Sequence, residues 1–544
     1  MSATPFQLPD PIADAPAPPP SPSPVATARE ATARALIVGS LIGVVMAAAN
    51  VYTSLKTSFI DGGSITAALL GFTLFATFKG LARRPYSALE NNITQTTAAS
   101  AAIMAFVLGV YGPMPAMTLI GQHVPSWAML SWGMALGLLG IFVAASLRAK
   151  LIVAEALPFP TGAATAEIIE TIHAGRETAL NRTRLLLFSA LTAAIITWFR
   201  DGHPSFIPAV TALPLTVAGL SAASLTLGIS WSPMMASIGI FMGFRVAASM
   251  FVGAVLTWGF LAPALVRAGI VSGSSYGTYV AWLVWPGLGL MAASTMLPLV
   301  LGWRSVGRSL MDVPAMILQK ASPQSAAGPA RFPLQRSIVT ACVVVVIGVG
   351  WLAFDLHPAV SILALLLAVI LAGVCGRAAG ETDLAPIGSV GMVTQLIFAG
   401  SGVSVSLLSG AIAAAESSQT SQTLWALKAG HRLKASPNAQ IAAQILGAAV
   451  GALVVVPVYL VLVKTYGVGT EALPAPAAMS WKATAEAVRG GLAAMPAYGP
   501  AAGAIGIGLG VVLCLLGRTR VARFLPSPMA LGIAALTPAS LSVA

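Results

Sequence analysis

Charge is scarce in this 544-residue sequence. Asp, Glu, Lys and Arg together make up only 8% of it, whereas 57% of the residues are hydrophobic and the mean hydropathy is +0.86. A soluble protein carries about 25% charged residues, so this composition cannot supply a water-exposed surface. Apolar runs long enough to cross a bilayer recur along the chain. The sequence therefore predicts an all-α polytopic membrane protein.

Residues that commonly carry catalysis or bind metals are also few. The three cysteines lie in apolar segments without C-x-x-C spacing, and the five histidines are scattered, so neither a disulfide framework nor a zinc site is indicated. There is no H-E-x-x-H motif and no Walker A loop. Residues 273–277 match a nucleophile elbow by letter but lack its strand–turn–helix context. We predict no enzyme, no metal and no cofactor, with a proton gradient as the energy source.

Basic residues outnumber acidic ones by 29 to 17. In a soluble protein this excess would indicate nucleic acid. Here the basic residues fall in short stretches between apolar runs, which is typical of cytoplasmic loops. We therefore predict the lipid bilayer and not nucleic acid as the partner, in a multi-pass protein of the cytoplasmic (inner) membrane. The sequence does not decide whether the protein forms a homo-oligomer.

The chain divides into four parts by composition. Residues 1–28 are rich in Pro, Ala and Ser and predict a disordered tail. Residues 303–337 are hydrophilic and predict a cytoplasmic linker between two transmembrane repeats, 29–302 and 338–544. The predicted spans are approximately 35–53, 65–78, a run that follows the polar stretch 90–102 and ends near 111, 128–147, 185–198, 215–229, 234–266, 278–301, 338–354, 359–374, 390–409, 441–463 and 501–516. Arg245 interrupts the long run 234–266, where we expect a turn between two helices.

A proline-interrupted stretch, Glu155–Ile169, stands out among the apolar runs. Pro158 and Pro160 disfavour helix, and a new helix is expected to begin at a capping Thr161. Transporters build substrate sites from such broken helices, whose N-termini face the cargo. The alternative is a loop followed by an ordinary helix.

A polar run from Glu90 to Ala102 leads into another span. Asn91 and Gln95 lie four residues apart and share a helix face, which favours a cavity lining over a lipid contact. The alternative, a solvated helix end, fits Glu90 better than it fits Gln95.

Three short matches relate the two halves in the same order. Glu155-Ala-Leu-Pro-Phe-Pro recurs as Glu471-Ala-Leu-Pro-Ala-Pro, Thr94-Gln95 as Thr394-Gln395, and Ser232-Pro-Met-Met-Ala as Ser527-Pro-Met-Ala. Paired interruptions in two halves are typical of transporter repeats. Basic residues near matching spans favour parallel copies, but the basic loop 428–434 then falls on the wrong side. A re-entrant segment within 403–420, which contains Glu416, would reconcile the two counts.

Several motifs together resemble those of the oligopeptide transporter family, which includes the yellow stripe-like metal-chelate branch. They are Asn50-Val-Tyr-Thr-Ser-Leu-Lys-Thr-Ser, Glu90-Asn-Asn-Ile-Thr-Gln, Leu157-Pro-Phe-Pro-Thr-Gly-Ala-Ala-Thr-Ala-Glu, Pro386-Ile-Gly-Ser-Val-Gly-Met-Val-Thr-Gln and Lys434-Ala-Ser-Pro-Asn-Ala-Gln. The resemblance implies about 14–16 transmembrane or re-entrant helices. It also implies a secondary, usually proton-coupled, importer of short peptides or metal–chelator complexes. Family members continue beyond the Ser-Pro-Met region ending at Met529, so a terminal helix is expected to be missing.

These observations define the expected site. The expected function is proton-coupled import of short peptides or peptide-like compounds, with a metal-chelate (siderophore-like) importer, a passive channel and a membrane-embedded enzyme as alternatives. Glu167 is the first candidate for proton coupling and Glu90 the second. For each polar side chain, the alternative role is to hold helices together. The predicted substrate-binding residues are Asn50, Tyr52, Lys56, Asn91, Asn92, Gln95, Pro158, Pro160, Thr161, Gly162 and Gln395.

Overall fold

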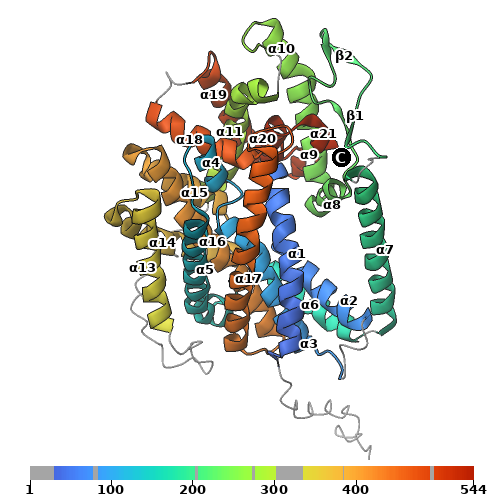
Figure 1. Ribbon diagram of the computed structural model, residues 1–544, viewed down its shortest axis with the longest axis vertical. Coiled ribbons are helices and arrows are strands. Elements are labelled where there is room, and N and C mark those ends of the chain that lie inside the picture. The colour runs from blue at the N-terminus through green and yellow to red at the C-terminus, as the bar shows by residue number, and fades with distance from the viewer. Residues whose placement is uncertain are drawn as a thin grey trace, which may run out of the picture.

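The computed structural model describes residues 30–77, 84–174, 176–201, 206–272, 276–301, 335–383, 385–490 and 495–543. Nearly all of its regular structure is helical (Figure 1), which confirms the all-α prediction. The predicted tail 1–28 and most of the predicted linker 303–337 lie outside the described residues. Within the described residues, seven helices are long and apolar enough to cross a membrane.

The larger of two helical bundles draws on both halves of the chain. Its first-half elements are α1 (Ala33–Thr57), α2 (Ser64–Thr77), α3 (Ala88–Val107), α4 (Pro113–Leu119), α5 (Ser126–Arg148), the π-helix Ala149–Ala154 and α6 (Pro160–Ala174). Its second-half elements are α13 (Gln335–Phe354), α14 (Pro358–Thr382), α15 (Ile387–Ile397), a 3₁₀ turn Ala399–Ser401, α16 (Val403–Arg432), α17 (Pro437–Tyr466) and α18 (Pro476–Gly490). The polar helices α3 and α16 are buried along most of their length because the apolar helices surround them.

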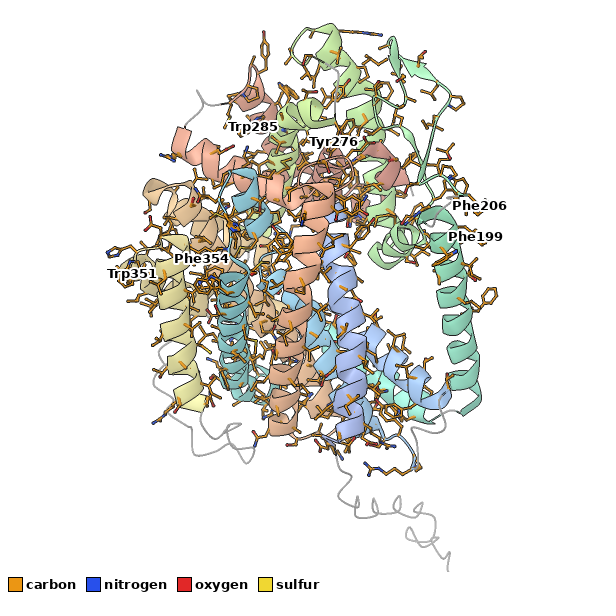
Figure 2. All side chains as sticks on the ribbon, in the orientation of Figure 1. Phe199, Phe206, Tyr276, Trp285, Trp351 and Phe354 are labelled. Carbon is orange, nitrogen blue, oxygen red and sulfur yellow. The ribbon has the colours of Figure 1, made fainter. Side chains whose placement is uncertain are left out.

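A smaller bundle lies above the larger one in Figure 1 and has its own core. It contains α8 (Pro233–Met242), α9 (Phe244–Ala254), the π-helix Val255–Leu261, α10 (Ala262–Arg267), α11 (Tyr276–Leu301), α19 (Gly499–Leu516), the 3₁₀ helix Arg520–Phe524, α20 (Pro528–Leu536) and α21 (Ala539–Val543). Tyr276 and Trp285 of α11 lie in this region (Figure 2). The long helix α7 (Arg176–Asp201) flanks both bundles, and Phe199 near its end packs edge-on against Phe206.

The predicted span 215–229 is wrong. This segment contributes to two short antiparallel pairs, in which β1 (Val210–Ala212) pairs with β4 (Gly228–Ser230) and β2 (Thr216–Val217) with β3 (Leu220–Ser221). Ala218 and Gly219 both have positive φ, as a two-residue hairpin turn requires. The local turn chemistry therefore overrides the apolar composition.

Two other boundaries depend on glycine. The predicted span 390–409 is wrong, because Gly402, at φ 113°, separates α15 from α16. The re-entrant segment expected within 403–420 is also wrong, since α16 is one continuous helix of 30 residues. The turn expected near Arg245 is confirmed, because Gly243 (φ 80°) separates α8 from α9.

Basic side chains collect at the end of the larger bundle where α1 begins and α5 and α16 end. Arg34 lies in the first turn of α1, Arg148 ends α5 and Arg432 ends α16. The backbone N–H of Ser436, just after α16, donates to Glu30, just before α1. The distribution of Lys and Arg predicts that this end faces the cytoplasm.

Candidate functional site

The stretch before Pro160, which contains Pro158, is not helical, as predicted, and it packs against the C-terminal end of α14. Phe159, between the two prolines, has φ 43° and donates its N–H to the carbonyl of Gly380 at 3.0 Å. The helix α6 then begins at Pro160, one residue before the predicted start. Thr161 donates its N–H to one carboxylate oxygen of Asp383 at 2.9 Å and its hydroxyl to the other at 2.6 Å. The carboxylate at this helix N-terminus therefore belongs to the protein itself.

The second interruption has the same geometry. Ala475, between Pro474 and Pro476, has φ 46° and donates its N–H to the carbonyl of Leu55 at 2.7 Å. Ala477 donates its N–H to the hydroxyl of Ser58 at 2.9 Å. Ser58 follows α1 as Asp383 follows α14, and both cap residues are left-handed, with φ 62° and 64°. Each broken helix thus begins on a cap residue contributed by the other half of the chain.

The two breaks lie at opposite ends of the larger bundle (Figure 1). The shared cap geometry matches α1 with α14. The Thr94-Gln95 and Thr394-Gln395 match would instead pair α3 with α15, which is a different register. Gln395 donates to the carbonyl of Trp481 at 3.4 Å, on the neighbouring α18. Its backbone carbonyl accepts from Ser406, and among the described residues no hydrogen bond joins Gln395 to the polar residues of α3.

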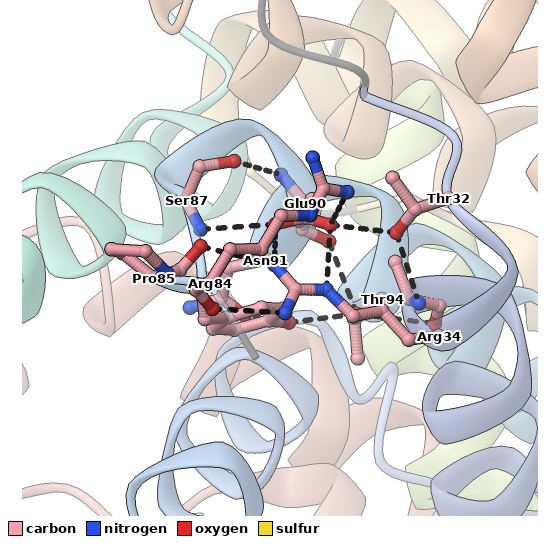
Figure 3. Close-up of polar contacts among 10 residues, drawn as sticks. Thr32, Arg34, Arg84, Pro85, Ser87, Glu90, Asn91 and Thr94 are labelled. Carbon is pink, nitrogen blue, oxygen red and sulfur yellow. Dashed lines mark hydrogen bonds and ion pairs between the residues drawn. The ribbon is translucent and has the colours of Figure 1, made fainter. Parts of the chain in front are cut away.

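Glu90 forms a charged clasp between the starts of α1 and α3 (Figure 3). Its carboxylate accepts from Arg34 Nε at 2.9 Å, Arg84 Nη2 at 3.1 Å and Thr32 Oγ1 at 2.7 Å. With Ser87 it also completes a capping box at the start of α3. Two guanidinium groups and a helix N-terminus keep this carboxylate ionised. Glu90 therefore acts as a structural clasp in this conformation.

A buried polar seam runs along α3, α16 and α17, with Asn91 at its edge beside Tyr86 and Gly71 of α2. We define it by its six amide side chains, Asn91, Asn92, Gln95, Gln419, Gln422 and Gln444, all of which are at most 1% exposed.

Close packing of α17 on α3 brings the two sides of this seam together. A Cβ atom at Gly447 would lie 2.2 Å from the carbonyl oxygen of Thr97, so only glycine permits this approach. Gln419 Nε2 donates to Ser100 Oγ at 3.3 Å and to Gln444 Oε1 at 3.2 Å, which joins all three helices. Gln422 Nε2 donates to Ser64 Oγ of α2 at 3.0 Å.

Every amide of the seam keeps an unused hydrogen-bonding atom. Among the described residues, no hydrogen-bond partner reaches the donors Nδ2 of Asn91 and Asn92 and Nε2 of Gln444, or the acceptors Oε1 of Gln95, Gln419 and Gln422. An unmet buried polar atom costs about 1–3 kcal/mol, so native interiors keep few of them. These six atoms are therefore available to hydrogen-bond a ligand. The mixture of donors and acceptors also fits neutral amide groups.

The other predicted site residues lie on α1, on α6 and in the stretch before α6. Asn50 donates to the carbonyls of Asp61 and Ala102, both at 2.9 Å, and so fixes the loop after α1. Tyr52 and Lys56 lie one turn apart on α1, with the Lys56 ammonium 5.6 Å from the ring centroid. Gly162 packs on the carbonyl of Trp425 in α16. Glu167 is exposed on α6.

Sequence reasoning missed most of the α16 and α17 contribution. Gln419, Gln422 and Gln444 were not predicted, and Glu416 was noted only as a carboxylate near apolar segments. The signal was an unbroken run of eight polar residues, Glu416–Thr423, in a chain with little polar sequence. Its length and lack of turn residues indicate a buried polar helix.

Comparison with known proteins identifies the group to which this architecture belongs. The model of the OPT oligopeptide transporter protein family matches residues 30–544. The chain belongs to this family. It is 25% identical to a putative oligopeptide transporter of Saccharomyces cerevisiae, with 85% of this chain and 82% of the relative covered. A putative oligopeptide transporter of Haemophilus influenzae is 25% identical over 78% of this chain and 71% of its own length.

The metal-chelate branch also matches. A probable metal-nicotianamine transporter of rice (Oryza sativa subsp. japonica) is 24% identical, with 92% of this chain and 79% of the relative covered. Membership of this oligopeptide transporter family makes the protein a multi-pass membrane transporter and not an enzyme.

Proposed function

We propose that this transporter is a proton-coupled secondary importer of short peptides or peptide-like compounds across the cytoplasmic membrane. The observation that carries the proposal is the set of unused amide donors and acceptors along the seam. Each peptide unit of a substrate offers one N–H donor and one C=O acceptor. Three free donors and three free acceptors on Asn and Gln side chains match that chemistry without adding charge.

The two helix breaks provide elements that can exchange partners during transport. Thr161 on α6 is held by Asp383, and Ala477 on α18 is held by Ser58, at opposite ends of the bundle. Both breaks flank α16, which contacts α6 and α18. Opening one docked break at a time would expose the seam alternately to the two sides of the membrane. No nucleotide-binding motif occurs in the sequence, so the energy for accumulation is assigned to an ion gradient.

Import of a metal chelate is the second candidate, and the rice relative's name favours it. A chelate of amino and carboxylate groups around a metal carries charge and would be bound by charged side chains. The six amides that define the seam are neutral, and Glu416 is the acidic residue of the adjoining polar run Glu416–Thr423. The neutral lining is the reason to place the peptide-like substrate first.

Uptake into proteoliposomes tests the proposal. The purified protein is reconstituted, an inward proton gradient is imposed, and labelled di- to hexapeptides and iron–nicotianamine are offered separately. Saturable accumulation of a peptide that stops when an ionophore collapses the gradient is the expected result. Accumulation of the chelate alone would move the substrate to the second candidate. Non-saturable equilibration that ignores the gradient would identify a passive channel and overturn the proposal.

A further inference from the structure

Among the described residues, one buried carboxylate, that of Glu416, belongs neither to the Glu90 clasp nor to the two helix breaks nor to the six amides of the seam. Glu416 lies near the midpoint of the 30-residue helix α16, roughly 20 Å from either end. It is 0% exposed, and neither of its carboxylate oxygens has a hydrogen-bond partner among the described residues. By contrast, Glu90 and Glu155 are paired with arginines, and Asp383 holds Thr161.

The helices packed against α16 offer Glu416 no counter-charge. Among the described residues, no ion pair reaches it. On α14, the Cys375 thiol lies beside Ser417, the residue that follows Glu416. Charged and titratable side chains occur on several elements around α16. Besides Cys375, they are Glu90 of α3, Arg148 of α5, Lys150 of the following π-helix, Glu167, Glu170 and His173 of α6, Arg377 and Glu381 of α14, Tyr459, Lys464 and Tyr466 of α17, Lys482, Glu486 and Arg489 of α18, and Lys428, His431 and Arg432 of α16 itself.

Two buried arginines on the neighbouring helices do not pair with Glu416. Arg148 lies too far along α5, and Arg377 is paired with Glu155. Gly140 of α5 packs on the Glu416 carbonyl, and Arg148 lies eight residues further on, roughly 12 Å along the helix axis. Arg377 of α14 binds both oxygens of Glu155, at 2.7 and 2.8 Å. A carboxylate so enclosed and without a cation is neutral in the described conformation.

Glu416 also lines a crevice of about 290 Å³ between α5, α13 and α14. Apolar side chains, among them Leu139, Phe142 and Val343, form most of its wall. Its other polar lining residues are Ser146, near the end of α5, and Gln335, the first residue of α13. Both lie toward the basic end of the bundle, so the crevice leads from Glu416 toward the predicted cytoplasmic side.

On the same helix, Glu416 is one turn from the seam. Gln419 lies three residues away, and residues so spaced are neighbours on a helix surface. A Cβ atom at Gly140 would meet both the Glu416 carbonyl and the Gln419 Cβ at 2.8 Å, so one point of α5 packs on both residues. Glu416 and the amide that joins α3, α16 and α17 therefore share one packing neighbour.

We propose that Glu416 is the proton-carrying group of this transporter, loaded while substrate occupies the seam and emptied through the crevice that ends at Ser146 and Gln335. This inference rests on the proposed proton-coupled function. The step is a reversible transfer of one proton between water and a carboxylate oxygen. Loss of the proton leaves an uncompensated negative charge inside the bundle, which favours rearrangement until the group is hydrated or reprotonated.

The test separates proton-driven accumulation of a peptide from exchange of that peptide across the membrane without a proton gradient. The peptide that wild-type protein accumulates in the uptake assay is used in two experiments, accumulation under an inward proton gradient and counterflow exchange without a gradient. We expect Glu416→Gln to lose at least tenfold in gradient-driven accumulation while keeping exchange within about twofold of wild type. Glu170→Gln, which changes an exposed carboxylate on α6, is the matched control and should behave as wild type.

Each outcome decides the proposal. Gradient-driven accumulation by Glu416→Gln, or its loss in Glu167→Gln alone, overturns the role of Glu416 and leaves proton-coupled import intact. Absence of gradient-driven accumulation in wild-type protein overturns both. If Glu416→Gln does not elute as a folded species, Ser146→Leu and Gln335→Leu replace it. Both fill the crevice, so each should slow accumulation at least threefold and spare exchange, and unchanged accumulation in both rejects the crevice as the proton route.

Discussion

Asp383 accepts hydrogen bonds from the backbone N–H and the hydroxyl of Thr161, 222 positions away in the sequence. The first residue after the prolines of α6 is thereby anchored to the residue that ends α14. Ser58 holds Ala477 in the corresponding place on α18. Because one anchor is a charged carboxylate and the other a neutral hydroxyl, the end at Asp383 should open at the greater cost.

Substitution of Asp383 by Asn tests this anchor. Asn keeps a left-handed backbone accessible but presents an N–H₂ group to one of the two Thr161 donors. We expect a loss of about 1–3 kcal/mol, the range for hydrogen bonds to charged groups, and a lower melting midpoint in detergent. Asp355→Asn is the matched control, since Asp355 also has positive φ but is exposed. Equal melting midpoints for the two variants would contradict the anchoring role.

Gly162→Ala should damage the contact between α6 and α16. The new Cβ would lie 2.4 Å from the carbonyl oxygen of Trp425, and backbone atoms cannot move away as a flexible side chain can. Overpacking of this kind costs about 1–3 kcal/mol. Gly348→Ala on α13 meets no atom within 4 Å and should instead be neutral or slightly stabilising. Melting midpoints and initial uptake rates check the comparison, and a Gly162→Ala protein as stable and active as the Gly348→Ala protein would contradict it.

The elements that sequence reasoning located correctly are those in which local signals agree with the packing. The length of their apolar runs placed α1, α5 and α17, and the prolines placed the break before α6. The errors arose where a local signal overrode composition, as at the Ala218–Gly219 turn, or where a glycine ended a helix, as at Gly402. Neither effect is visible in hydropathy.

The site was only half predictable for a different reason. Asn91, Asn92 and Gln95 can be recognised from the sequence because they lie in a polar run that resembles a motif of the oligopeptide transporter family. Their partners, however, depend on which helices pack together. Gln419 and Gln444 lie more than 300 positions from Ser100, and no pattern in one sequence fixes that contact. The hydrogen bonds between Asp383 and Thr161 could not be predicted for the same reason, because they depend on how α6 packs against the end of α14.

Glu90→Gln should weaken the clasp without abolishing proton dependence. The neutral amide leaves Arg34, 17% exposed, with no partner charge, at a cost of up to about 3 kcal/mol for a partly buried pair. Arg84 is 51% exposed and loses little. The melting midpoint should fall, while the ratio of uptake with and without a proton gradient should stay at the wild-type value. A lost gradient response in protein that remains folded would instead return the coupling role to Glu90.

Gln95→Leu tests whether the seam binds substrate or only joins helices. Gln95 Nε2 donates to Asn92 and Thr96 on its own helix, and Oε1 has no hydrogen-bond partner among the described residues. Leucine therefore breaks no hydrogen bond between described helices. If Oε1 binds a substrate N–H, the loss of about 1.4 kcal/mol raises KM roughly tenfold while the maximal rate changes little. Gln122→Leu, in an exposed loop, is the control and should keep the wild-type KM. An unchanged KM in Gln95→Leu, measured with the peptide that wild-type protein accumulates, would reduce this residue to helix packing and weaken the case for the seam as the binding surface.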